Sequence, residues 1–145
     1  TFAQLAQDKR LDFGIDIDVD ETVTDSLSPL RHVFGTAAEL AQPQPGSNKC
    51  ALLLNVFRSS GARHDNVPDM RIVLIKPVLV AEAPLDVHNY GAVNKEFPQQ
   101  TTGDQFFDEA QWESYRMLGV EIGRRIFDPA DKDQRHHLWN ILAVR

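Results

Sequence analysis

The sequence feature that most constrains the fold is the apolar run at residues 50–57, which reads CALLLNVF and is interrupted only by Asn55. A continuous apolar run of this length is typical of a β-strand that is buried on both faces. Residues 70–75 predict a second buried strand, which Pro77 ends or kinks because proline has no N–H to donate to a neighbouring strand. We therefore expect the chain to be built on a sheet.

A third strand is indicated at residues 11–20, where apolar and acidic residues alternate with the period of a strand that has one buried face. Its buried side would carry Leu11, Phe13, Ile15, Ile17 and Val19. Its other side would carry Asp12, Asp16, Asp18 and Asp20.

The last three of these aspartates superficially resemble the start of a calcium-binding loop. Counted from Asp16, however, the sixth and twelfth positions hold Glu21 and Leu27, where an EF-hand loop needs Gly and Glu. A solvated acidic strand face is the favoured interpretation, and its charges would also discourage pairing with another sheet edge.

Residues 104–126 predict a long amphipathic helix with Thr102 or Asp104 as the capping residue at its start. Its apolar stripe would consist of Phe107, Ala110, Ser114, Leu118 and Ile122, widened by Trp112, Tyr115 and Ile126. The aromatic residues here, with Phe106, are expected to belong to the core. Shorter helices are predicted at residues 84–95 and 130–144.

The composition fits one domain or domain fragment spanning residues 1–145. A net charge of −6 argues against a nucleic-acid partner. The single cysteine, Cys50, lies in an apolar run and is expected to be a buried, inert thiol. No apolar run approaches the roughly 20 residues of a membrane span. The first residue is Thr1 and not Met, which would fit an excised or processed piece.

No complete catalytic constellation is visible, and we assign no catalytic, metal or cofactor residues. The cluster Ser59, Ser60, His64 and Asp65 is close in sequence, but triad residues must converge in space, and a loop is the favoured interpretation. The adjacent histidines His136 and His137 cannot easily share a metal ion, because neighbouring residues of a helix point about 100° apart. There is no Gly-x-Ser-x-Gly motif and no glycine-rich phosphate loop.

Three segments taken together resemble the C-terminal part of bacterial patatin-like phospholipases. They are LDFGIDIDVD, RIVLIKPVLVAEAPLDVHNY and FPQQTTGDQFFDEAQWESYRMLG, of which the last, at residues 97–119, is the most specific. The resemblance covers residues 11–126. It implies a serine hydrolase acting on lipid esters, with a Ser–Asp dyad in Gly-x-Ser-x-Gly and Asp-Gly-Gly/Ala segments that should precede Thr1.

The expected fold is therefore α/β, with a partial sheet of three to four strands packed by helices. The implied partners are the N-terminal half of the same enzyme and a lipid ester substrate, and the resemblance leaves localisation and membrane attachment open. Neither dyad motif occurs in this chain, so no catalytic residue can be transferred to it. Two alternatives stay open: a self-standing, non-catalytic binding or interaction domain, and an unrelated small enzyme using the Ser59 cluster.

Overall fold

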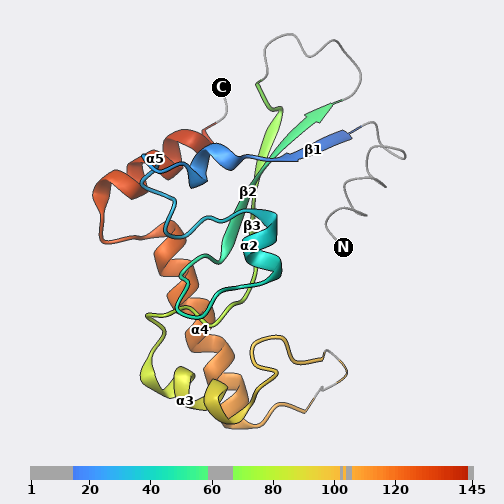
Figure 1. Cartoon of the computed structure of the whole chain (residues 1–145), viewed down its shortest axis with the longest axis vertical. Coiled ribbons are helices and arrows are strands. Elements are labelled where there is room, and N and C mark those ends of the chain that lie inside the picture. The colour runs from blue at the N-terminus through green and yellow to red at the C-terminus, as the bar shows by residue number, and fades with distance from the viewer. Residues whose placement is uncertain (1–14, 59–66, 102, 104–105, 144–145) are drawn as a thin grey trace.

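The computed structural model describes residues 15–58, 67–101, 103 and 106–143, and Figure 1 shows how their elements are arranged. The strands are β1 (Ile15–Val19), β2 (Ala51–Arg58) and β3 (Met70–Ile75). The helices are η1, a 3-10 helix (Glu21–Thr24), and the α-helices α2 (Ala37–Ala41), α3 (Leu85–Val93), α4 (Glu109–Phe127) and α5 (Lys132–Leu142). The expectation of a small α/β fold is confirmed.

The sheet has the strand order β1-β2-β3, and both pairs of strands are antiparallel. The apolar run forms the central strand, where Leu54 pairs with Val19 on one side and with Ile72 on the other. Leu53 and Leu54 point to opposite faces of the sheet and both are buried. The prediction of a strand buried on both faces is therefore confirmed for β2.

One face of the sheet, which we call the helix face, is covered by α4 and α5. Ala51 and Leu53 of β2 belong there to the main hydrophobic cluster, together with Leu118, Ile122, Ile126 and Leu138 of the two helices. In Figure 1, α4 runs along the long axis of the molecule and leads into α5 beside the sheet. Burial of each large apolar side chain in such a cluster stabilises the fold by about 1.5–3 kcal/mol.

The opposite face, which we call the open face, is apolar on all three strands. It carries Ile17, Val19, Leu52, Leu54, Val56, Met70, Ile72 and Leu74, since residues paired across strands share a face. Leu40 of α2 packs there against β2, and the β1 side chains adjoin this cluster, which confirms the apolar side predicted for the described part of β1.

Strand β3 differs from the prediction that it would be buried. Its open-face side chains Met70, Ile72 and Leu74 are 51%, 37% and 40% exposed. On the helix face, Val73 packs against the main cluster. The strand is an edge of the sheet, and Ile75, which pairs with Ala51 on the helix face, is also 39% exposed. The burial prediction is therefore wrong on the open face and at the end of the strand on the helix face.

Helix α4 confirms the predicted long helix, with a later start. Asp108 caps it by accepting a hydrogen bond from Gln111 N at 2.7 Å, while Thr102 and Asp104 lie outside the described residues. The stripe is buried at Ser114, Leu118, Ile122 and Ile126. Phe106, Phe107 and Trp112 are 94%, 48% and 56% exposed, and Ala110 is also exposed, so the assignment of these four residues to the core is wrong.

Helix α3 packs closely against its surroundings at Gly91. A Cβ atom placed on this glycine would lie 3.0 Å from Leu79 Cδ2 and 3.4 Å from Phe97 Cδ1. The glycine therefore lets the helix approach the core, which offsets its low helix propensity. Phe97 in turn meets the rings of Tyr90 and Tyr115 edge-on, with centroids 5.1 Å and 4.9 Å away.

Candidate functional site

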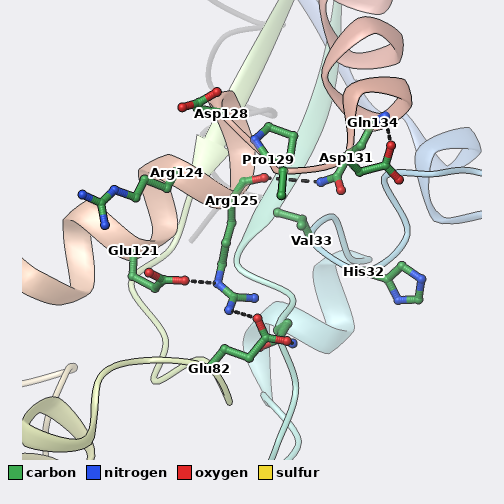
Figure 2. A pocket seen from close by; sticks show the side chains of 12 residues that line it. His32, Val33, Glu82, Glu121, Arg124, Arg125, Asp128, Pro129, Asp131 and Gln134 are labelled. Atoms are coloured by element: carbon green, nitrogen blue, oxygen red, sulfur yellow. Dashed lines mark hydrogen bonds and ion pairs between the residues drawn. The ribbon is translucent and has the colours of Figure 1, made fainter.

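A polar pocket of about 470 Å³ lies where α4 ends, beside the connection between β3 and α3. Figure 2 shows the guanidinium of Arg125 between two carboxylates. Its Nε donates to Glu121 Oε1 at 2.8 Å, and its Nη2 pairs with Glu82. The backbone carbonyl of Arg125 accepts a hydrogen bond from Gln134 Nε2 of α5 at 3.3 Å. We call this group of contacts the Arg125 junction, because it ties three segments together.

Five of the six charged side chains that line this pocket, all but Arg124, have partners within the chain. Asp128 pairs with Arg135 Nη1 at 3.2 Å, and Asp131 caps α5 by accepting from Asp133 N at 2.8 Å. Arg124 is exposed, and Figure 2 shows its side chain pointing away from the Arg125 pair. The lining includes four carboxylates and two arginines, so the pocket does not favour an anion. Its arrangement fits a structural junction better than a catalytic site.

A second cavity, a groove of about 640 Å³, lies between the loop after α2, the segment after β3 and the cis Phe97–Pro98 turn. Its lining is largely apolar and includes Pro43, Pro45, Val78, Leu79, Ala81 and Pro98. We call it the proline groove. Pockets of about 300–1,000 Å³ with apolar walls and a few polar groups are typical small-molecule sites.

The polar side chains of the proline groove are Lys76, His88, Gln44 and Gln99. Lys76 Nζ donates to Leu40 O at 2.6 Å, and His88 Nε2 donates to Ala81 O at 3.1 Å. Gln99 Nε2 donates to Pro77 O at 2.6 Å. No carboxylate lines the groove, so its charged group is the Lys76 ammonium.

The residues of the predicted serine cluster, at positions 59, 60, 64 and 65, lie outside the described residues, and that alternative stays a prediction. In the acidic strand, Asp20 is a structural cap. Its Oδ1 accepts from Thr22 N and its Oδ2 from Asn55 Nδ2, each at 3.1 Å. Across the described part of the chain, no group of three His, Cys, Asp or Glu side chains could hold a metal ion.

Cys50 is fully buried at the start of the central strand, as its apolar neighbours predict. Burial disfavours the charged thiolate and raises the pKa of the Cys50 thiol to about 11. The thiolate is the nucleophilic form of cysteine, so this side chain is inert near neutral pH.

Sequence reasoning missed both the Arg125 junction and the proline groove. The groove is assembled from three segments that lie far apart in the sequence and have no shared periodicity. The one local signal is the Lys76-Pro77 pair, at which a strand stops and the chain continues without regular structure. The sequence indicated the Arg125 junction still less. A basic residue such as Arg125 in the last turn of a helix is already explained by its favourable interaction with the helix dipole.

Comparison with known proteins gives no match: no family model fits the chain, and no similar curated protein or solved structure was found. None of the helices in the described ranges is both long and apolar enough to span a bilayer.

Proposed function

We propose that this chain is the C-terminal structural portion of a patatin-like lipid acyl hydrolase. The serine and aspartate of the dyad would lie upstream of Thr1. The sequence resemblance over residues 11–126 supplies the class of enzyme. The structural observation that supports the proposal is the open face of the sheet, whose apolar side chains on β3 are left in solvent.

An antiparallel sheet such as this one can leave one face in water, but that face then carries mostly polar side chains. The open face here is apolar, and an apolar face is normally buried against another layer. Here α4 and α5 supply one layer, and among the residues that the structure describes the short helix α2 supplies a small part of the other. Met70, Ile72 and Leu74 would be buried by the N-terminal half of the enzyme. In this proposal the chain is the scaffold that completes the sheet, and the upstream half performs the chemistry.

The most direct test is the coding sequence upstream of Thr1, which should contain Gly-x-Ser-x-Gly and Asp-Gly-Gly/Ala. The longer protein should hydrolyse p-nitrophenyl esters and lose this activity when the motif serine is replaced by alanine. The 145-residue chain alone should show no turnover. An upstream sequence without both motifs would refute the proposal. Turnover by the chain alone that disappears in Ser59→Ala or Ser60→Ala would favour the small-enzyme alternative.

A second measurement separates a structural portion from a self-standing binding domain. Met70 on the open face is half exposed and should be oxidised readily by peroxide in the 145-residue chain. In the longer protein its oxidation should be much slower, while that of Met117, on α4, serves as the internal reference. Equal oxidation rates of Met70 in both proteins would show that the open face is not covered, which favours the self-standing domain.

A further inference from the structure

The proline groove has walls that are both apolar and rigid. Pro43 and Pro45 come from the loop after α2, and Pro98 comes from the turn after α3. Val78 and Leu79 of the segment after β3 add aliphatic surface. The proline ring fixes φ, so these walls lose little conformational freedom when a ligand binds.

These walls suit an alkyl chain better than a peptide. An extended peptide is recognised largely by main-chain hydrogen bonds along its groove. The three prolines have no N–H to donate, and the side chains of His88 and Gln99 already donate to carbonyl groups of this chain. An alkyl chain needs none of these bonds and gains about 0.8 kcal/mol for each buried CH₂.

Lys76 gives the groove a charged end. Its ammonium carries three donors, of which one is used by Leu40 O at 2.6 Å, and it has no other partner in the described part of the chain. The absence of carboxylates from the lining leaves this positive charge uncompensated within the groove. A ligand with one anionic group would therefore complete the site, since charge-assisted hydrogen bonds are about twice as strong as neutral ones.

We propose that the proline groove is a binding site for a single-chain, long-chain carboxylate, with its head group on Lys76 and its alkyl chain against Pro43, Leu79 and Pro98. This site lies wholly in the present chain and does not depend on the proposed hydrolase function. If both proposals hold, the groove would take the class of acid that lipid-ester hydrolysis releases.

The test is titration of the 145-residue chain with laurate, below the concentration at which laurate forms micelles, by isothermal calorimetry. Lys76→Met should weaken laurate binding about tenfold or more, because it removes a charge-assisted bond. It should leave the binding of dodecanol, which has the same chain length and no charge, nearly unchanged. Lys95→Met removes an exposed lysine outside the groove and should leave both affinities as they are.

Lys76→Arg keeps the positive charge and should retain most of the laurate affinity, which guards against a Lys76→Met variant that folds poorly. Leu79→Asp should weaken laurate and dodecanol alike, because it places a charge in the apolar wall. Absence of laurate binding to the wild-type chain would overturn the proposal. So would equal laurate affinity in the wild-type and a folded Lys76→Met variant, or a clear preference for dodecyl phosphate over laurate. None of these results depends on the upstream sequence, so failure here is distinct from failure of the proposed function.

Discussion

The two faces of the sheet are built from the same three strands but differ in how completely they are buried. On the helix face, Leu53 is fully buried in a cluster that extends through α4 to Leu138 of α5. On the open face, Leu52 is buried beside Leu40, yet Leu74, its direct partner on β3, is 40% exposed. Apolar composition alone therefore does not decide burial. A strand face is buried only where a second layer reaches it.

The largest expected difference in the free energy of unfolding is between matched leucine-to-alanine substitutions on the two faces. Leu53→Ala should destabilise the chain by about 2–5 kcal/mol, because it leaves a cavity in the main cluster. Leu74→Ala should cost less than about 1 kcal/mol, because much of that side chain is already in water. Urea denaturation followed by circular dichroism gives both values.

Leu52→Ala is the control that separates position in the sheet from the choice of face. It lies on the open face but under α2, so its cost should approach that of Leu53→Ala. If Leu74→Ala destabilised the chain as much as Leu53→Ala, the open face of β3 would be covered in solution. The contrast between the two faces would then fail. In the longer protein of the proposed function, the cost of Leu74→Ala should rise.

The next effect concerns the Arg125 junction, which links α4 to the segment before α3 and to α5. Arg125→Met should destabilise the chain by about 1.5–3 kcal/mol, because Glu121 loses its partner in a mostly buried setting. Arg124→Met is the matched control, since the side chain of Arg124 is exposed and points away from the ion pairs of Arg125 (Figure 2). Thermal unfolding of both variants should show a clear loss only for Arg125→Met. Similar losses for both would mean that the junction contributes little.

The contrast between the faces also shows how far the sequence predicts the fold. The apolar run that forms β2 and the alternation that forms β1 were sufficient to place two strands, because local periodicity reports how many faces a strand buries. The same logic placed β3 but overestimated its burial. Periodicity reports that Ile72 and Leu74 are apolar, and it does not report whether a second layer is present.

Helix α4 shows a second limit. The existence of a long helix and the C-terminal part of its apolar stripe followed from the sequence. Its first residue did not, because the segment offers several possible capping residues and the one that caps the helix is Asp108. The face that the helix buries in its first turn also differs from the predicted stripe. Gln111 is buried with its Nε2 bonded to Gln100 Oε1 at 3.2 Å, while Trp112 beside it faces solvent. A polar residue with a satisfied partner can lie on the buried face, which a count of apolar positions misses.

The candidate sites were the least predictable part of the molecule. The proline groove depends on Pro43, Lys76 and Pro98 meeting across long stretches of chain. The local signal at Lys76 marks the end of a strand and does not indicate which segments meet there. The Arg125 junction likewise joins residues that are 43 positions apart. Both are tertiary features, so a single sequence without structural information cannot position them.

A smaller effect is expected from making the open face polar. The double substitution Ile72→Lys and Leu74→Lys should change the free energy of unfolding by no more than about 1 kcal/mol, since both side chains are partly in water. It should reduce concentration-dependent association and the binding of a hydrophobic dye, because charges on an edge strand oppose edge pairing. Sedimentation and dye fluorescence measure these changes. A large loss of stability would indicate that the open face is covered within the chain itself.

The smallest effect concerns α2, the helix that covers part of the open face. Glu39 accepts a hydrogen bond from Lys49 Nζ at 2.5 Å and one from Thr36 N at 2.9 Å. These contacts hold the pKa of the Glu39 carboxyl below its ordinary value, the contact with Lys49 contributing most. Because the folded-state pKa is lowered, the stabilisation is present above the ordinary glutamate pKa and is lost as the pH falls through the folded value.

Lys49→Met should therefore raise the Glu39 titration midpoint towards its ordinary value, as followed by NMR of the side-chain carboxyl. The accompanying loss of stability near neutral pH should stay below about 1 kcal/mol, because the ion pair is partly exposed to solvent. The loss should shrink as the pH falls and Glu39 becomes protonated in both proteins. An unchanged midpoint would show that the capping contact with Thr36 sets this pKa. In that case α2 would be held on the open face by its own cap and by Leu40, without help from the ion pair.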